Sequence, residues 1–286
     1  MSTSRRPRAI GISRSPAYSP LQHATNDRAI LEATLSELES RGWSTGYLRE
    51  QDVVSAALPA AELYLNMCQG SPAARALLLA EAAGIRFFNR PSSVLRCHRQ
   101  RLIPTLLASQ IPFPPTVLLR TDRAPDPLEL QALAQLDGGP LWLKRGGVHA
   151  ERADDVRQIE RKELASGLAR FAARGIRTAA VQAHVAGPLV KFYGVASGAF
   201  FHAYLAESNA PVPRHLADLE TLRALAFLAA ARLKLDVFGG DVVFADRARP
   251  VLIDLNDWPS FAPVREQAAR AIAGYVHAAR PRGALR

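Results

Sequence analysis

The chain has 286 residues, 48% of them hydrophobic, and a formal net charge of +10 at pH 7. This length and apolar content predict a globular protein with a core large enough for two or three small subdomains. No uninterrupted apolar run approaches the roughly 20 residues that cross a bilayer, and no signal-peptide core follows the basic start of the chain. We therefore expect a cytoplasmic protein without a membrane partner.

The basic residues are mostly dispersed arginines and form no block typical of a nucleic-acid-binding module, so we expect no nucleic-acid partner. Lysine is scarce: the only examples are Lys144, Lys162, Lys191 and Lys234. Because arginine is used almost everywhere else, a lysine inside a strand indicates a need for a compact ammonium group. Lys144 and Lys191 both lie in predicted strands.

Short apolar runs alternate with helical patterns over the first third of the chain. Strands are predicted at residues 9–12, 43–48, 62–67 and 85–88, and helices at 26–41 and 71–83. Such alternation is typical of a parallel α/β unit, and we assign residues 1–90 to it. The next segment, 91–109, is helical in pattern, and Pro104 is expected to kink this helix or to start a second one.

Residues 91–286 follow a different order and form the second predicted domain. Strands are predicted at 117–119, 141–144, 179–184, 189–195 and 199–205, with helices at 128–136, 161–174, 216–234 and 263–279. Three consecutive strands and a later hairpin indicate an α+β unit that is largely antiparallel.

The hairpin lies within residues 239–259, where two apolar runs flank a polar connector. A turn centred on Arg247 and Ala248 would place Asp241 opposite Asp254, and Asn256 would return to the same face. Two carboxylates and an amide oxygen favour Mg²⁺ or Mn²⁺ over Zn²⁺. The alternative is that one aspartate caps a turn and the other marks a strand end.

Four further sequence features follow one another over roughly residues 85 to 275. They are the connection from Asn89–Arg90–Pro91 to Ile111–Thr116, the run Leu141–Gly147, the run Ala180–Gly187 with the strand that follows it, and the hairpin aspartates with Asn256 and Pro259. In this order they resemble the motifs of the ATP-grasp superfamily. The resemblance implies an ATP-grasp fold with an N-terminal Rossmann-like α/β subdomain. It also implies a first lobe at 91–184 with a phosphate loop and a second lobe at 185–286 with the metal-binding hairpin.

The resemblance further implies an ATP cofactor with Mg²⁺ or Mn²⁺. Asp241, Asp254 and Asn256 are then the metal ligands, and the expected nucleotide-binding residues are Arg99, Lys144, Gly146, Gly147, Gln182, Ala183, His184, Val185 and Lys191. Arg99 stands where family members commonly carry a phosphate-binding lysine. Lys191 is expected to act also on the transferred phosphoryl group, and Arg265 to reach an acceptor carboxylate, so both are our candidate catalytic residues.

Within the superfamily the motifs are most similar to the ribosomal-protein glutamate ligases and the inositol-trisphosphate kinases. We therefore expect an ATP- and magnesium-dependent enzyme that joins a carboxylate to an amine through an acyl phosphate. The partners would be a small-molecule or peptide carboxylate and an amine acceptor, and the chain could form a homodimer. The alternatives are a small-molecule kinase of the inositol-phosphate type and a catalytically silent nucleotide-binding scaffold.

Overall fold

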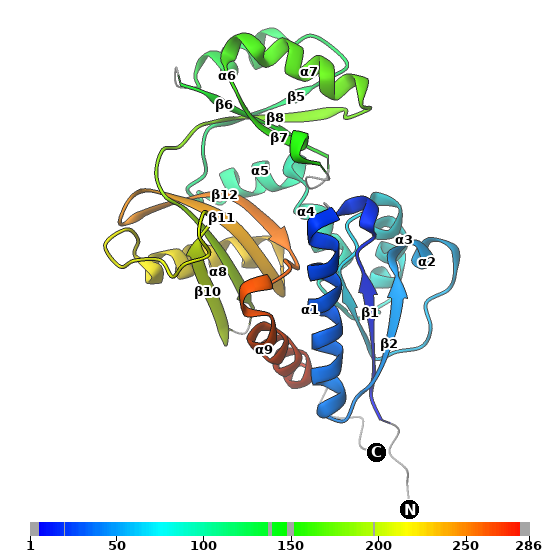
Figure 1. Ribbon diagram of the computed structural model, residues 1–286. Coiled ribbons are helices and arrows are strands. Elements are labelled where there is room, and N and C mark those ends of the chain that lie inside the picture. Colours follow the sequence, from blue (N-terminus) through cyan, green and yellow to red (C-terminus); the bar gives the residue numbers. More distant parts are fainter. Residues whose placement is uncertain (1–5, 20, 137–138, 148–151, 197, 281–286) are drawn as a thin grey trace, which may run out of the picture.

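The computed structural model describes residues 6–19, 21–136, 139–147, 152–196 and 198–280. The strands of these residues form three four-stranded sheets, one in the N-terminal region and two in the remainder of the chain (Figure 1). One parallel sheet precedes two antiparallel ones, as the sequence patterns predicted.

The N-terminal sheet has the strand order β2-β1-β3-β4, and all of its strands run parallel. Its strands are β1 (Arg8–Ser13), β2 (Ser44–Arg49), β3 (Leu63–Asn66) and β4 (Phe87–Phe88), and its helices are α1 (Leu21–Ser40), α2 (Glu50–Ser55) and α3 (Ser71–Ala82). The central strands β1 and β3 are almost entirely buried, which explains their nearly continuous apolar sequence. The predicted parallel α/β unit is therefore confirmed.

Two helices, α4 (Pro91–Arg96) and α5 (Arg99–Ala108), connect the N-terminal sheet to the rest of the chain. Pro104 does not start the second helix, because it lies inside α5, and the break between the two helices falls at Cys97 and His98 instead. This break makes Arg99 the first residue of α5, and its side chain is buried.

The second sheet has the order β5-β8-β6-β7 and its pairs are antiparallel. Its strands are β5 (Thr116–Arg120), β6 (Leu141–Arg145), β7 (Val156–Ile159) and β8 (Thr178–Ala183). Helices α6 (Pro127–Ala134) and α7 (Leu164–Ala173) cover its outer face (Figure 1). Strand β7 was not predicted, because its central residues Arg157 and Gln158 are exposed and give it little apolar character.

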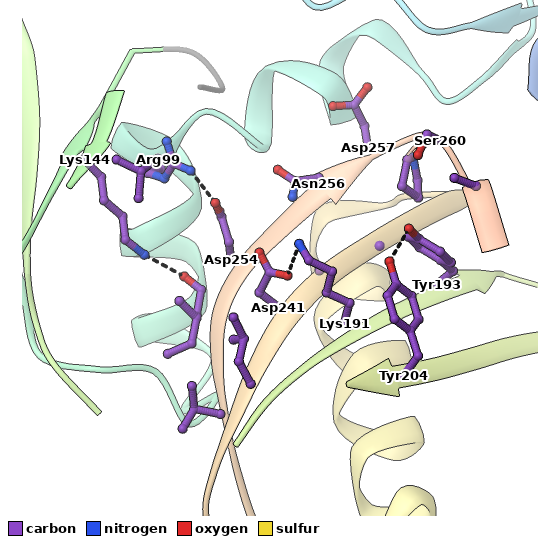
Figure 2. Close-up of a pocket in the computed structure, with 18 of the residues that line it drawn as sticks. Arg99, Lys144, Lys191, Tyr193, Tyr204, Asp241, Asp254, Asn256, Asp257 and Ser260 are labelled. Atoms are coloured by element: carbon purple, nitrogen blue, oxygen red, sulfur yellow. Dashed lines mark hydrogen bonds and ion pairs between the residues drawn. The ribbon is translucent and has the colours of Figure 1, made fainter. Parts of the chain in front are cut away.

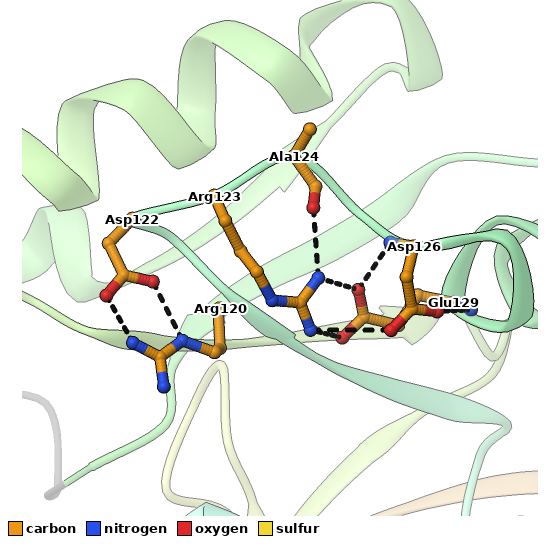
Figure 3. Close-up of polar contacts among 6 residues, drawn as sticks. All are labelled: Arg120, Asp122, Arg123, Ala124, Asp126 and Glu129. Atoms are coloured by element: carbon orange, nitrogen blue, oxygen red, sulfur yellow. Dashed lines mark hydrogen bonds and ion pairs between the residues drawn. The ribbon is translucent and has the colours of Figure 1, made fainter.

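An exposed cluster of charged residues fixes the start of α6 (Figure 3). The Asp126 side chain accepts a hydrogen bond from the Glu129 N–H at 2.9 Å, and the Glu129 side chain accepts one from the Asp126 N–H at 2.9 Å. Arg123 donates to both oxygens of Glu129, at 2.7 and 2.8 Å. This reciprocal capping satisfies backbone donors that the first helical turn leaves without partners.

The third sheet has the order β10-β9-β11-β12 and is antiparallel. Its strands are β9 (Leu189–Val195), β10 (Phe200–Leu205), β11 (Val237–Asp246) and β12 (Arg249–Asp257), followed in the chain by α9 (Arg265–Ala278), while α8 (Leu219–Leu233) precedes the hairpin. Helix α9 packs along α1, so the C-terminal helix returns to the N-terminal subdomain (Figure 1).

One hydrophobic core joins the N-terminal sheet to the third sheet. It includes Leu31 of α1, Leu65 of β3, Val195 of β9 and Ile272 of α9, all fully buried. Shared packing therefore holds the N-terminal sheet and the third sheet against each other. In the described part of the chain, no helix is long and apolar enough to cross a membrane.

Candidate functional site

A cavity of about 780 Å³ lies where the three sheets approach one another. Residues of all three regions line it: Arg14, Asn26 and Gln69 from the N-terminal region, Trp142, Lys144 and Gln182 from the second sheet, and Lys191, Tyr193, Tyr204, Asp241, Asp254 and Asn256 from the third sheet. A concave site shared by several sheets can bind different parts of one ligand, or two ligands, at the same time.

The acidic hairpin forms one wall of this cavity. Asp241 of β11 pairs with Asp254 of β12, and Asn256 pairs with Gly239, as the sequence predicted for the opposed aspartates. Figure 2 shows Asp241, Asp254 and Asn256 along neighbouring strands, and all three line the cavity. The expected oxygen donors are therefore brought together in space.

Close packing at Gly240 makes this arrangement possible. A Cβ atom at Gly240 would lie 2.4 Å from the Asp254 carbonyl oxygen and 2.7 Å from the Phe192 ring. Only glycine lets β11 approach these neighbours so closely. Gly240, which precedes Asp241 in the sequence, thus allows the close approach of β11 and β12 that positions both aspartates.

A basic side chain contacts each carboxylate. Lys191 Nζ lies 3.0 Å from Asp241 Oδ1, and Arg99 Nη2 contacts Asp254 Oδ2 (Figure 2). The Asp241 charge raises the pKa of Lys191 above its usual value, against the opposing effect of burial. The Arg99–Asp254 pair is almost completely buried, and Arg99 also donates to the Arg145 carbonyl oxygen at 3.0 Å.

Lys144 extends from β6 toward the hairpin and is buried. Its Nζ donates to Gln182 Oε1 at 2.6 Å and lies 3.5 Å from the Ile253 carbonyl oxygen. Burial lowers the pKa of Lys144 to about 8, the charge of Asp254 opposes this shift, and the charge of Arg99 adds to it. Lys144 therefore connects the second sheet to the hairpin, and its ammonium group loses its proton more readily than that of an exposed lysine.

Four consecutive residues that were expected to bind the nucleotide, here called the hinge residues, all line the cavity: Gln182, Ala183, His184 and Val185. Besides accepting from Lys144, Gln182 donates from Nε2 to Thr116 Oγ1 at 3.2 Å, so its amide orients the lysine. The backbone N–H of Ala183 donates to the Pro115 carbonyl at 2.9 Å and that of His184 to the Pro140 carbonyl at 3.3 Å.

Gly146 and Gly147, which were expected to bind phosphate, follow β6 and are not among the residues that line the cavity. The Gly146 N–H donates to the Thr178 carbonyl oxygen at 2.8 Å, and a Cβ at Gly146 would meet the Thr178 side chain at 2.8 Å. Gly146 is thus packed against β8, and its N–H is used inside the protein. Gly147 has open space around it, and the chain that follows lies outside the described residues.

Arg265, the first residue of α9, is not among the cavity-lining residues. Its Nη2 donates to Asn26 Oδ1 at 2.6 Å, and Asn26 itself lines the cavity. The structure therefore places Arg265 in contact with a cavity-lining residue of α1 but not in the lining itself.

Sequence reasoning missed several cavity residues. Trp142 lies two residues before Lys144 in β6, and its Nε1 donates to His184 Nδ1 at 3.1 Å. The hydroxyl groups of Tyr193 and Tyr204 are 2.6 Å apart, and burial raises the pKa of both. The alternation of side chains along a strand could have identified Trp142 and Tyr193, since each lies two residues from a predicted lysine.

The donor set fits a hard divalent cation. Asp241, Asp254 and Asn256 offer only oxygen ligands in one cavity, and the two carboxylates carry charge that Lys191 and Arg99 offset. The described residues contain no group of three or more His, Cys, Asp and Glu arranged for a metal. A metal bound here would therefore rely on two carboxylates and one amide.

Comparison with known proteins identifies the fold. No protein-family model and no curated protein matches the sequence. Among solved structures, a D-alanine–D-alanine ligase from Bacillus anthracis complexed with ATP is 13% identical, with a TM-score of 0.68, and the match covers 96% of this chain and 99% of that one.

Two further solved structures agree with this match. A RimK domain ATP-grasp protein from Sphaerobacter thermophilus is 18% identical with a TM-score of 0.68, and the match covers 94% of this chain and 99% of that one. The ATP-grasp ligase PsnB, complexed with a precursor peptide and AMPPNP, is 14% identical with a TM-score of 0.61, covering 96% and 99%. The expected resemblance is confirmed at the level of structure: this chain has the ATP-grasp fold, with a parallel α/β subdomain at its N-terminus.

Proposed function

We propose that this chain is an ATP- and magnesium-dependent ligase that joins a carboxylate to an amine. The observation that carries the proposal is the convergence of Lys144, Lys191 and Arg99 with Asp241 and Asp254 in one cavity. Cations and oxygen donors close together suit a polyphosphate and its metal ion. The structural neighbours that are ligases, one of them complexed with ATP, support the same class of reaction.

The nucleotide would lie at the end of the cavity formed by the second sheet. The hinge residues 182–185 and Trp142 provide a partly apolar wall for the base, and Lys144 lies next to them with its charge directed toward the hairpin. Phosphate groups near Lys144 would stabilise its charged form, since an anion raises the pKa of a lysine. Arg99 adds a second cation on the same side, which supports its proposed role in phosphate binding.

The metal would be held by Asp241, Asp254 and Asn256. When bound, the ion would neutralise negative charge on the phosphates. The present contacts of Lys191 with Asp241 and of Arg99 with Asp254 occupy the same carboxylates. We therefore infer that both basic side chains turn from the carboxylates to the phosphates when nucleotide and metal enter.

The proposed reaction has two steps. A substrate carboxylate oxygen attacks the γ-phosphorus of ATP, the bond to the leaving ADP breaks, and an acyl phosphate forms. The amine nitrogen then attacks the acyl carbon, and inorganic phosphate and a proton leave. Lys191 would stabilise charge on the transferred phosphoryl group in both steps, and no protein side chain needs to act as a nucleophile.

The proposal is tested first by nucleotide binding and then by products. Calorimetry with AMPPNP and Mg²⁺ should show metal-dependent binding to the intact protein. A screen of carboxylates and amines should then release ADP and inorganic phosphate in equal amounts, and hydroxylamine should trap an acyl intermediate. Formation of ADP without free phosphate would indicate a kinase, and no nucleotide binding by the folded protein would indicate a silent scaffold.

A further inference from the structure

One histidine among the hinge residues keeps a hydrogen-bond donor that the described part of the protein does not use. Trp142 Nε1 donates to His184 Nδ1 at 3.1 Å, so Nδ1 of this ring is an acceptor. In a neutral imidazole the other nitrogen then carries the proton. His184 Nε2 is therefore an N–H donor, and no described residue accepts a hydrogen bond from it.

The other polar groups of the hinge side chains are already engaged. The Gln182 amide accepts a hydrogen bond from Lys144 through Oε1 and donates one to a threonine hydroxyl through Nε2. The side chains of Ala183 and Val185 are apolar, and both line the cavity. Among the side chains of these four described residues, His184 Nε2 is therefore the polar atom that is left for a ligand.

Aromatic and aliphatic groups surround this donor. The ring centres of Trp142 and His184 are 6.3 Å apart, with their planes inclined at 32°. Val185 follows directly, and Val243 of β11 lies close to the next part of the chain, since a Cβ built at Gly187 would be 3.0 Å from Val243 Cγ1. All five residues line the cavity. A site of this kind takes up a flat, largely apolar group, and a single polar group in its wall fixes the orientation of the ligand.

The same side-chain contact occurs a second time in the chain, away from the cavity. Trp43 Nε1 donates to His277 Nδ1, also at 3.1 Å, and neither residue lines the cavity. In the cavity, by contrast, Trp142 is half-buried and His184 is exposed. The hydrogen bond therefore orients a ring that a ligand can reach, and the Trp43–His277 pair provides a control with the same chemistry.

We propose that Trp142 orients His184 so that its Nε2–H donates to a hydrogen-bond acceptor in the nucleoside part of the bound nucleotide. His184 is then a specificity-determining residue, and Trp142 is a positioning residue that acts through it. The inference rests on the proposed ATP-dependent function and adds what the site selects: a nucleoside with an acceptor, either a ring nitrogen of the base or a ribose oxygen, opposite His184. Because Nδ1 is occupied, a nucleoside that offers only a donor there gains no hydrogen bond.

The test is calorimetric titration of the full chain with ATP analogues and Mg²⁺, with no carboxylate or amine substrate present. The panel contains ATP and analogues that each lack one acceptor: 1-deaza-, 3-deaza-, 7-deaza-, 2′-deoxy- and 3′-deoxy-ATP. We expect His184→Leu to weaken ATP binding about fivefold, the effect of one hydrogen bond. His184→Gln keeps an N–H donor on a side chain of similar reach and should retain most of the affinity.

One analogue should reproduce the effect of the His184→Leu substitution. It should bind the intact protein about fivefold more weakly than ATP, and His184→Leu should weaken it no further, because the same hydrogen bond is already lost. If this analogue is one of the deaza compounds, the acceptor belongs to the base. If it is one of the deoxy compounds, the acceptor belongs to the ribose.

A second set of variants tests the positioning role of Trp142. Trp142→Phe keeps an aromatic ring but removes the indole N–H, and it should weaken ATP binding about threefold. The same change should cost less in the His184→Leu background, where only the packing of the ring on the ligand is affected. Trp43→Phe is the matched control and should leave ATP affinity unchanged. In ¹⁵N NMR spectra the His184 Nδ1 resonance should move toward that of a free imidazole in Trp142→Phe, but not in Trp43→Phe.

Nucleotide binding by the intact protein separates this inference from the function on which it rests. Three results would overturn the inference while AMPPNP still binds with Mg²⁺: unchanged ATP affinity in His184→Leu, an equal effect of His184→Leu on every member of the panel, or an equal cost of Trp142→Phe in both backgrounds. If the folded, intact protein binds no AMPPNP, the proposed function is contradicted, and this inference with it.

Discussion

Asp241 and Asp254 lie directly opposite each other on adjacent antiparallel strands, yet each contacts a different basic residue. Lys191 reaches Asp241 from the neighbouring strand β9, whereas Arg99 reaches Asp254 from the start of α5. Two carboxylates on directly opposed residues would repel each other if no positive charge compensated them. The hairpin thus has an ion pair on each side of a site that suits a divalent cation.

Replacement of Asp254 should weaken nucleotide binding through loss of the metal ligand. We expect Asp254→Asn to lower the magnesium-dependent affinity for AMPPNP by at least about tenfold. The free energy of unfolding should also fall, by about 1–3 kcal/mol, because buried Arg99 loses its charged acceptor. Calorimetric titration and urea unfolding measure the two effects.

Asp246→Asn is the matched control for this substitution. Asp246 belongs to the same hairpin but lies at its exposed end, and its ion pair with Arg249 is solvent-accessible. Exposed pairs contribute about 0–1 kcal/mol, so both the affinity and the stability should stay near those of the intact protein. Equal AMPPNP affinity in the two variants would remove Asp254 from the proposed metal site.

Titration of Lys144 should make nucleotide affinity depend on pH. The pKa of this lysine is about 8, so a growing fraction is neutral as the pH rises above that value. We expect AMPPNP affinity to decrease between pH 7 and 9, with proton uptake on binding that calorimetry in several buffers detects. Lys144→Arg should bind without this pH dependence because arginine remains charged.

The lowered pKa of Lys144 also predicts how the free energy of unfolding depends on pH. The pKa of Lys144 is lower in the folded protein than its ordinary value of 10.5, so the unfolded chain binds more protons between about 8 and 10.5. The contribution of this lysine to the free energy of unfolding should therefore rise with pH across that window. In Lys144→Met this rise should be absent, and an unchanged slope would contradict burial of the charged amine.

Lys191 should influence the rate of ligation more than it influences nucleotide binding. Its pKa is raised by Asp241, so it is charged across the neutral range and can stabilise a transferred phosphoryl group. We expect Lys191→Met to reduce kcat by about a hundredfold, with a smaller change in AMPPNP affinity. The exposed Lys162→Met is the control; a variant at position 191 with normal kcat would exclude the proposed role.

Gly240 should tolerate no side chain. A Cβ there would lie 2.4 Å from the Asp254 carbonyl oxygen, so Gly240→Ala must displace β12 or the Phe192 ring. We expect the free energy of unfolding to fall by about 1–3 kcal/mol and metal-dependent AMPPNP binding to weaken. In Gly274→Ala, where nothing lies within 4 Å of the new Cβ, the helix α9 should gain about 0.5–1 kcal/mol. Urea unfolding of both variants measures the contrast.

The sequence patterns predicted the order of the elements because hydrophobic periodicity and turn residues act locally. The register of the hairpin was also predicted, although for an incomplete reason. Asp241 faces Asp254 because two irregularities compensate: one lies between Phe244 and Asp246, and the other between Asp241 and Val242. Each shifts the pairing by one residue, and together they restore the register that a simple turn would produce.

Local sequence patterns did not predict one exposed strand and the position of one helix break. Strand β7 has charged and polar residues at its centre, so no apolar alternation marks it. Pro104 was expected to kink a helix or to start a second one; it lies inside α5, and the second helix starts at Arg99 instead. The consequence is functional, because this break brings the Arg99 side chain to Asp254.

The sequence by itself determined the opposed aspartates and the two strand lysines, since these depend on spacing along neighbouring strands, and its motifs indicated the ATP-grasp fold by resemblance. Only the tertiary structure decided which charges meet. Arg99 and Asp254 are 155 residues apart, and Arg14 reaches the Trp258 carbonyl across 244 residues. Such contacts arise from the packing of three sheets around one cavity, and no local periodicity encodes the side-chain directions that bring them together.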